Sequence, residues 1–135
     1  MQPKFVHLRF HSEYSITDGI VRLNPAIKQM KEWGVGAFGQ TDLMNMFGSV
    51  RFYEPCHKEG IKPILGCDLW ITNEEDPAHP FRLTVYCMDH DGYHSLCVLL
   101  TRAWLENQCH VKGRGEVKES WLAGEGTKGL IGISG

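Results

Sequence analysis

Apolar and polar side chains alternate, or recur at helical spacing, along most of the chain, and this pattern predicts strands and helices in turn. The opening segment 5–10 alternates, so we expect a strand that points His7, Arg9 and His11 to one face. Polar residues follow at once and end in the turn signal Asp18-Gly19. Short apolar runs predict four more strands, at 35–40, 61–71, 81–88 and 130–133.

Helical spacing predicts three helices between these strands. The first begins with Asn24 as N-cap and Pro25 at its first position, and it ends at Gly34. The second covers about 46–59, where Pro55 predicts a kink or a break. The third follows the turn at 89–92. The expected helix stripes are Ile27, Met30 and Trp33; Met46, Val50, Tyr53 and His57; and Tyr93, Leu96, Cys97, Leu100, Ala103 and Trp104. The large aromatic residues Trp33, Tyr53, Trp70 and Trp104 are therefore expected to pack in the core.

Alternation of strands and helices favours an α/β fold with a largely parallel sheet or part of a barrel. The 135 residues fit one domain. Because the last predicted strand ends the chain with no helix to cover it, we expect a truncated piece of a larger domain.

Composition and charge change this picture little. A formal net charge of -2 gives no strong field for nucleic acid, so contact with DNA would need a local patch or another part of a larger protein. The five cysteines form no CxxC pair and are expected to be reduced, mostly buried thiols. With no recognisable signal peptide or membrane-spanning run, we expect a cytoplasmic protein without a membrane partner.

Imidazoles and carboxylates near predicted strand ends suggest a metal-dependent phosphoesterase site. The candidate ligands are His7, His11, Asp18, Asp42 and Asp68. Such a ligand set suits zinc, manganese or iron, and clustered metals activate water and neutralise a phosphate. The alternative is that each is a separate surface or capping residue, and spacing alone leaves both open. Two interpretations are also open for the basic turn at 112–115: it binds a phosphate, or it is a solvated loop.

Several segments resemble one known family. FVHLRFHSEYSITDG, TDLMNMFGSVRFYEPCHKEGIKPILGCDLWI, DHDGYHSLCVLLTRA and GLIGISG are similar, in this order, to the N-terminal PHP (polymerase and histidinol phosphatase) domain of bacterial replicative DNA polymerase III alpha subunits. The resemblance implies a partial, distorted β/α barrel (TIM-like, PHP-type), with 1–135 as the N-terminal part of a PHP domain. The rest of that domain and the polymerase core, with its magnesium site, would be absent.

The family's metal motifs are incomplete in this sequence. In metal-binding members the first motif reads His-x-His, where this chain has Arg9 and His11. The second reads Thr-Asp-His, whose histidine is Leu43 here, and a glutamate stands at the position of Asp68. Arginine is always charged and has no lone pair for a metal. The expected remnant of the metal site is Arg9, His11, Asp18, Asp42, Leu43 and Asp68, with no catalytic residue, no metal and no cofactor in this domain.

This loss of ligands implies a structural domain. We expect Arg9 to pair with Asp42 or Asp68 and thereby to replace the charge of a metal ion. The resemblance then implies support of the polymerase core and docking of the proofreading exonuclease subunit, with other replicative subunits as further partners and DNA reached through the absent core. The alternative is an active metal-dependent phosphoesterase or 3'-5' exonuclease.

Overall fold

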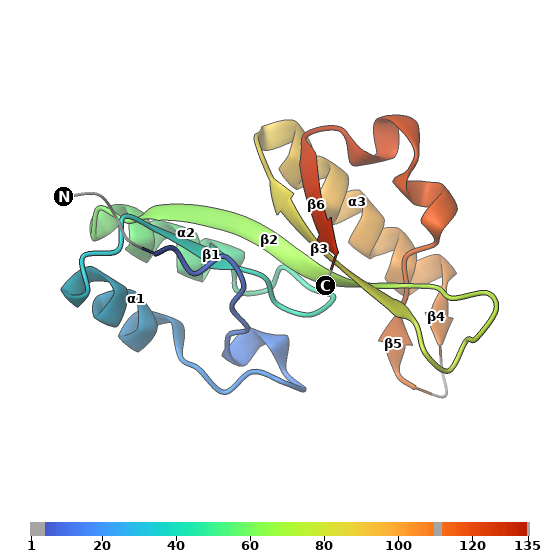
Figure 1. The fold of residues 1–135 in the computed structure, drawn as a ribbon, viewed down its shortest axis with the longest axis horizontal. Helices are drawn as coiled ribbons and strands as arrows, with labels where there is room; N and C mark the ends of the chain where they lie inside the picture. Colours follow the sequence, from blue (N-terminus) through green and yellow to red (C-terminus); the bar gives the residue numbers. More distant parts are fainter. Residues whose placement is uncertain (1–4, 110–111, 135) are drawn as a thin grey trace. The chain divides into compact units, whose positions relative to one another are not determined.

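A computed structural model describes residues 5–109 and 112–134. The chain divides into two compact units, Met1–Gly66 and Cys67–Gly135 (unit 1 and unit 2; Figure 1). One long strand, β2 (Lys62–Ile71), contributes its first half to unit 1 and its second half to unit 2. None of the helices in the described part of the chain is long and apolar enough to span a membrane.

Unit 1 packs two helices against a short parallel strand pair. Its elements are η1 (Glu13–Ser15), α1 (Leu23–Glu32), β1 (Ala37–Gln40), α2 (Ser49–Lys58) and the start of β2. β1 pairs with β2 in parallel, with Ala37 opposite Lys62 and Gln40 opposite Leu65. The core of this unit consists of Leu23, Ala26, Ile27, Met30, Phe38, Phe52, Cys56 and Ile61. The parallel pair agrees with the expected strand–helix–strand order.

The opening segment is not the strand that its pattern predicts. Its backbone still runs beside β1, because the carbonyl of His7 accepts from Gly39 N–H at 2.8 Å and that of Phe10 accepts from Thr41 N–H at 2.9 Å. Three steps along the opening segment therefore match two steps along β1. One extra residue interrupts the ladder as a bulge does, and the strict alternation of side chains is lost with it. Gly39 is needed here, since a Cβ on it would lie 2.4 Å from the Leu8 carbonyl oxygen.

The helices of unit 1 differ from the prediction in two respects: the start of α1 and the buried face of α2. α1 begins at Leu23 with Arg22 as N-cap, so Asn24 is not the cap. α2 continues through Pro55 to Lys58 without a break, and it buries Phe52 and Cys56. Val50 and Tyr53, expected on its inner stripe, are 63% and 44% exposed. The pattern fits either face of the helix, and in the structure Phe52 and Cys56 pack inward instead.

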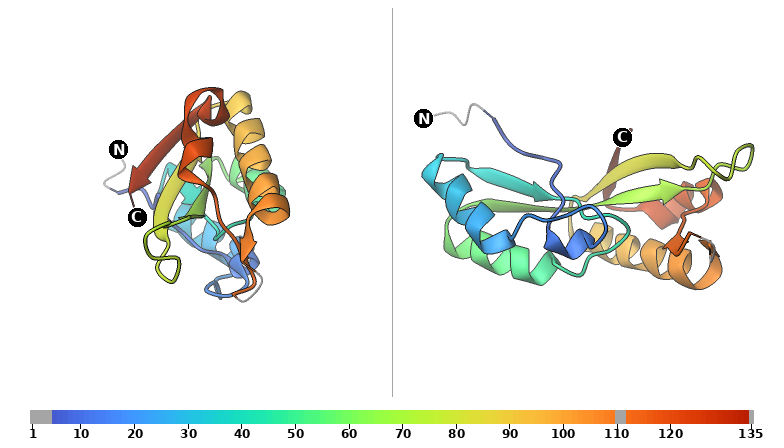
Figure 2. Two further views of the ribbon diagram at one scale, coloured as in Figure 1. Left: turned by 90° about the vertical axis from the view of Figure 1, so that its right-hand side faces the viewer. Right: turned by 90° about the horizontal axis from the view of Figure 1, so that it is seen from below.

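Unit 2 packs one long helix on an antiparallel strand pair. Its elements are the second half of β2, β3 (Phe81–Cys87), α3 (His90–Glu106), β4 (Gln108–Cys109), β5 (Arg114–Gly115), η2 (Glu119–Leu122), η3 (Gly124–Thr127) and β6 (Leu130–Ser134). α3 runs along β3 and β6, as Figure 2 shows. β6 pairs antiparallel with β3, with Leu83 opposite Ser134. The expectation of a largely parallel sheet is therefore wrong for this unit.

Most predicted elements of unit 2 are confirmed, but Trp104, which the pattern placed in the core, is partly exposed. β3, α3 and β6 lie within a few residues of the predicted ranges, and Asp89 caps α3 by accepting from Gly92 N–H at 2.9 Å. A two-stranded antiparallel pair, β4 and β5, follows α3 and lies outside the predicted strands. Trp104 is 37% exposed, and Trp33 in unit 1 is 62% exposed. Indole side chains with a polar N–H are rarely buried completely, so a helical stripe overestimates their burial.

Candidate functional site

The carboxylate of Asp42 lies directly after β1 and is enclosed by protein donors. Its Oδ1 accepts from Ser12 N–H at 2.6 Å, and its Oδ2 accepts from Ser12 Oγ at 2.7 Å and Gln40 Nε2 at 2.8 Å. Asp42 is 2% exposed. Ser12 follows the opening segment, which runs beside β1. This pairing places the backbone N–H and hydroxyl of Ser12 at the end of β1. At least three of about four acceptor positions of this carboxylate are filled within the unit.

Two further properties describe this centre of unit 1. Burial raises the pKa of Asp42 above its ordinary value, although the hydrogen bonds from Ser12 and Gln40 lower it in part. The other amide atom of Gln40, Oε1, is buried and has no hydrogen-bond partner among the described residues. Gln40 Oε1, which lacks a partner, thus belongs to a side chain that donates to the well-partnered carboxylate of Asp42.

His11 and Asp18, two of the predicted ligands, do come together. His11 Nδ1 lies 2.9 Å from Asp18 Oδ2. The hydroxyl of Ser15 donates to Asp18 Oδ1 at 2.5 Å and accepts from the backbone N–H of Leu43 at 3.0 Å. This network joins the loop after the opening segment to the residues after β1. Leu43 takes part through its backbone, and its side chain is half-buried.

The carboxylate of Asp68 belongs to unit 2 and is completely buried. The hydroxyl of Thr84 donates to its Oδ1 at 2.5 Å. Arg82 Nη1 lies 3.9 Å from its Oδ2, and the Arg82 side chain is 25% exposed. Both residues come from β3, where side chains two positions apart share a face. A cation and a hydroxyl from one strand therefore meet the carboxylate of its neighbour.

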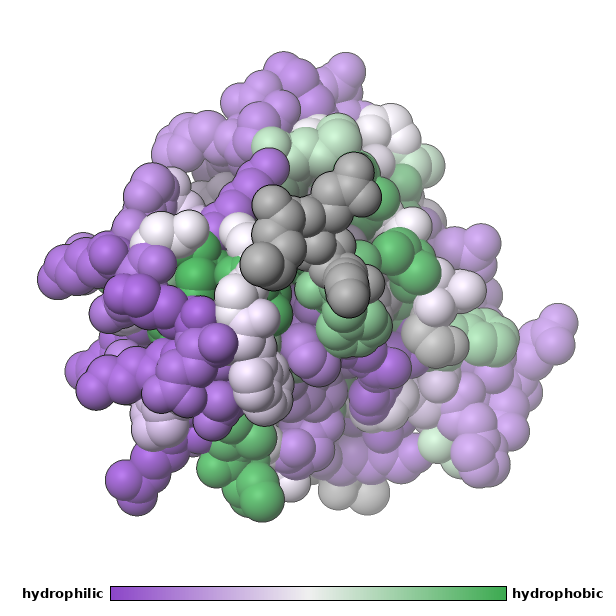
Figure 3. Space-filling model, turned by 60° about the vertical axis from the view of Figure 1, so that its left-hand side comes forward, coloured by the Kyte–Doolittle hydropathy of each residue, from purple (hydrophilic) through white to green (hydrophobic). Residues whose placement is uncertain are grey.

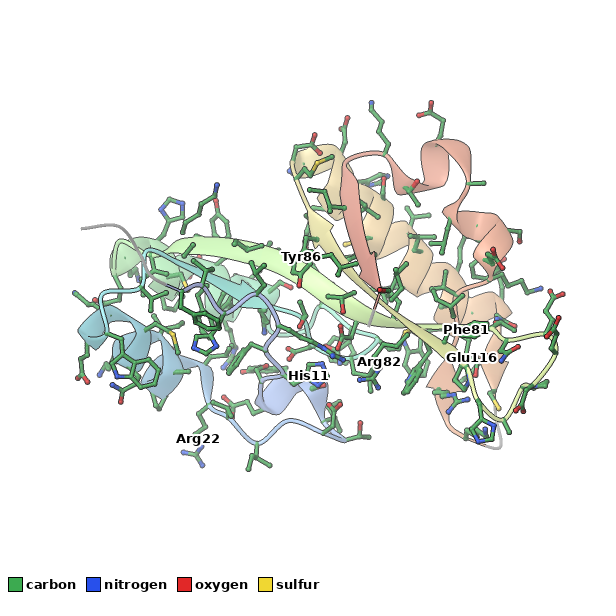
Figure 4. All side chains as sticks on the ribbon, viewed as in Figure 1. His11, Arg22, Phe81, Arg82, Tyr86 and Glu116 are labelled. Carbon is green, nitrogen blue, oxygen red and sulfur yellow. The ribbon has the colours of Figure 1, made fainter. Side chains whose placement is uncertain are left out.

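Trp70 lies two residues beyond Asp68 on β2 and carries two guanidinium groups. The Cζ atom of Arg82 lies 4.2 Å from the centre of its indole ring, and that of Arg114 lies 5.3 Å away. Arg114 Nε also donates to Glu116 Oε1 at 2.9 Å. Figure 4 labels Arg82 on β3 and Glu116 beyond β5. Two charge pairs thus share one indole.

The remaining sequence candidates lie elsewhere. The ring of His7 contacts Phe5 at 4.6 Å between centroids and Phe38 at 6.4 Å, which is a packing environment. Arg9 is exposed, and its predicted pairing with Asp42 or Asp68 stays a prediction. In the basic turn, Lys112 Nζ donates to the Ala78 carbonyl at 2.8 Å. Within 5–109 and 112–134, no three His, Cys, Asp or Glu side chains gather closely enough to hold a metal ion.

Sequence reasoning missed the residues that donate to the two carboxylates. These are Ser12, Gln40, Thr84 and Arg82. A usable signal existed for Arg82 and Thr84, since they form the polar side of an alternating strand. Ser12 and Gln40 gave none, because hydroxyl and amide side chains are common beside any strand.

A groove of about 420 Å³ lies in unit 1 between the start of α1 and the middle of α2. Its charged lining residues are Glu13, Arg22, Arg51 and Glu54, and Figure 4 labels Arg22. The Cζ atom of Arg51 lies 5.9 Å from the ring centre of Tyr14. Because the lining contains equal numbers of both charges, the groove indicates no particular class of ligand.

Solved structures share this fold at low sequence identity. An amidohydrolase from Chromobacterium violaceum, solved with bound sulfate and no metal, has a TM-score of 0.57 at 17% identity over 73% of this chain and 32% of its own. A protein from Bifidobacterium adolescentis described as a putative metal-dependent phosphoesterase has a TM-score of 0.52 at 13% identity, with the same coverage. These similarities establish the mixed α/β fold.

Curated relatives are more similar in sequence. DNA polymerase III subunit alpha of Neisseria meningitidis is 41% identical over 134 residues, and that of Vibrio cholerae is 37% identical over 133 residues. These matches cover 99% and 98% of this chain but 12% and 11% of the two relatives, so the chain spans about a ninth of their length. The family model described as PHP domain matches residues 7–135. The expected resemblance is thereby confirmed, and the chain belongs to the PHP domain family.

Proposed function

We propose that this chain is the first part of the PHP domain of a replicative DNA polymerase III alpha subunit. The observation that carries the proposal is identity of 37–41% to such subunits along 98–99% of the chain. The intact protein would then perform DNA-directed DNA synthesis in DNA replication, with its polymerase site and magnesium in the part that this chain does not contain. The complete PHP domain would close into a distorted β/α barrel, of which the two strand pairs are a beginning.

Within that protein the domain is a scaffold without metal-dependent chemistry. Support comes from the positions where the family binds metal. Arg9 and Leu43 replace two imidazoles, and the donors of Ser12 and Gln40 surround Asp42. A metal ion at Asp42 would have to displace several of these donors. An active metal-dependent phosphoesterase or exonuclease is for this reason not favoured.

The scaffold would dock a second replicative subunit, which we take to be the proofreading exonuclease. Exposed apolar side chains on unit 1 support this: Phe47, just before α2, and Val50 and Tyr53, on α2, are 68%, 63% and 44% exposed. Exposed apolar side chains that gather in one region are typical of an interaction site. On the face shown in Figure 3, apolar side chains reach the surface at separate places among hydrophilic ones.

Co-purification of the exonuclease subunit with the full-length polymerase subunit tests the docking role. Val50→Asp should weaken capture about tenfold or more, because a charge would enter an apolar contact. Leu105→Asp is the matched control, since Leu105 is an 80% exposed residue of α3 and should leave capture unchanged. Equal capture by the wild type, Val50→Asp and a protein lacking 1–135 would contradict the docking proposal.

A further inference from the structure

Two isoleucines project into solvent from the loop 16–21 of unit 1, between η1 and α1. Ile16 is 70% exposed and Ile20 is 94% exposed. The one charged side chain of this loop is Asp18, and its two oxygens lie against His11 and Ser15. The loop therefore presents an apolar tip.

The backbone of Ile16 is strained. Its φ is 68° and its ψ is -63°, and the N–H of Thr17 donates to the Ser15 carbonyl at 2.8 Å, which closes a γ-turn of positive φ. This turn is rare, and a β-branched residue at positive φ is an outlier. Strained backbone persists only where the surrounding structure holds it, and it is most frequent at functional sites. The strain at Ile16 therefore points to a use for this loop.

Hydrogen bonds hold the loop at both of its ends. The hydroxyl of Ser15 donates to Asp18 Oδ1 at 2.5 Å and accepts from the Leu43 N–H at 3.0 Å. At the other end, the N–H of Glu13 donates to the Val21 carbonyl at 2.9 Å. A fixed loop that carries stiff β-branched side chains loses little conformational entropy when it binds.

We infer that the loop 16–21 is a preorganised contact for the docked subunit, and that Ile16 and Ile20 enter an apolar depression on the surface of that subunit. The inference rests on the proposed docking role and names a second element of the same surface. A depression with a charged floor is not suitable, because its charges would lose water without gaining a partner.

The groove of unit 1 connects this loop with the exposed apolar side chains of α2. Arg22, which directly follows the loop, and Glu54 both line the groove. Glu54 lies one helical turn after Val50, so the two side chains are neighbours on α2. The loop, the groove and the exposed side chains of α2 are therefore adjoining parts of one surface.

Other occupants fit the loop less well. Nucleic acid is bound mainly through lysine and arginine, and the residues 16–21 include neither. A second copy related by a two-fold axis would place two projecting loops against each other, and such a contact buries little area. An apolar depression on a different protein is the occupant that the loop favours.

The affinity of the full-length polymerase subunit for the exonuclease subunit tests the inference. Ile20→Asp should weaken this affinity about tenfold, because a charge would enter an apolar contact. Since Ile20 is 94% exposed, the same change should alter the unfolding constant of the 135-residue chain less than about threefold. Leu105→Asp on α3 is the matched control, because Leu105 is also highly exposed, and it should leave the affinity unchanged.

Two variants of Ile16 test the preorganisation. Ile16→Ala and Ile16→Gly both remove the side chain, but only glycine adopts this backbone without strain. The glycine variant should therefore have an unfolding constant about threefold lower than that of the alanine variant. It should nevertheless bind the exonuclease subunit about threefold more weakly than the alanine variant, because its loop is no longer fixed. Equal affinities of the two variants would overturn the preorganisation.

The outcomes distinguish this inference from the proposed function. If Val50→Asp weakens capture and Ile20→Asp does not, the inference is overturned and the docking role stands. If both variants and the protein lacking 1–135 capture the exonuclease subunit like the wild type, the docking role itself is contradicted. Sedimentation of the 135-residue chain tests the second copy: dimers that Ile20→Asp dissociates, together with unchanged capture, would overturn the inference.

Discussion

Asp42 in unit 1 and Asp68 in unit 2 are both buried carboxylates next to a strand, and the two units stabilise them in different ways. Asp42 accepts from one backbone N–H, one hydroxyl and one side-chain amide, which are all neutral donors. Asp68 has one hydroxyl and, at 3.9 Å, a guanidinium. Several neutral donors thus meet the carboxylate in unit 1, whereas a hydroxyl and a nearby guanidinium from β3 meet the one in unit 2.

The difference predicts how each centre responds to change. Neutral donors act at short range and in set directions, so removing their common acceptor leaves all of them without a partner. A cation acts over a longer distance and tolerates small movements, but its removal leaves a buried charge. A buried carboxylate can therefore be stabilised by two physical routes within one chain.

Asp42→Ala should have the largest effect among the changes that test unit 1. It should lower the free energy of unfolding by about 3 kcal/mol, because Ser12 and Gln40 would keep buried donors without an acceptor. Asp42→Asn should cost about 1 kcal/mol, since its amide oxygen can still accept and Gln40 can turn its unpartnered Oε1 toward the new N–H. Urea unfolding measures both. Equal losses for the two variants would mean that these donors matter little.

Removal of a single hydroxyl should matter more in unit 2 than in unit 1. Thr84→Val keeps the shape of the side chain and should cost about 2 kcal/mol, because the Asp68 oxygen loses a strong donor. Ser12→Ala should cost about 1 kcal/mol, since Asp42 keeps the backbone and Gln40 donors. Denaturant unfolding of the two variants in one buffer gives the comparison. The reverse order would contradict the distinction between the two centres.

Trp70→Phe sharpens the description of unit 2. A phenyl ring attracts a guanidinium less strongly than an indole, so we expect a loss of about 0.5–1 kcal/mol. The loss should shrink when Arg82 is already glutamine. A loss of the same size in both backgrounds would show that the ring only fills space.

The smallest expected effect concerns pH. Because burial raises the pKa of Asp42, the folded state binds a proton more readily than the unfolded state between the ordinary value near 4 and the raised value. Stability relative to Asp42→Asn should therefore be greatest below about pH 4, fall as the pH rises through this window and stay level above it. Thermal unfolding of both proteins across this range measures the difference. A rise with pH would mean that hydrogen bonding outweighs burial.

Much of the fold could be predicted from the sequence, because apolar runs and turn residues act locally. β3, α3 and β6 lie close to their predicted ranges for this reason. The opening strand could not be placed, since the extra residue opposite β1 depends on a partner distant in sequence. The predicted buried face of α2 was wrong for a similar reason. Phe52 and Tyr53 are adjacent, and only packing decides which of them turns inward.

The candidate site was less predictable than the fold. The sequence placed Asp42 and Asp68 near strands, and it brought His11 and Asp18 into one list of candidates. It gave no means to find the donors, because a hydrogen bond from Gln40 or Thr84 requires an exact position that no spacing encodes. The sequence offered Arg9 as a partner of Asp42 or Asp68, which stays a prediction, and it did not single out Arg82, which stood on the polar side of a predicted strand and lies 3.9 Å from Asp68.

We propose that protein groups, and not a metal ion, satisfy Asp42 and Asp68. Metal analysis of the complete PHP domain, combined with its melting temperature before and after chelation, tests this most directly. We predict less than about 0.1 equivalent of zinc, manganese or iron and a melting temperature that changes by less than about 1 °C on chelation. One or more equivalents of bound metal, together with a clear drop in melting temperature after its removal, would contradict the claim.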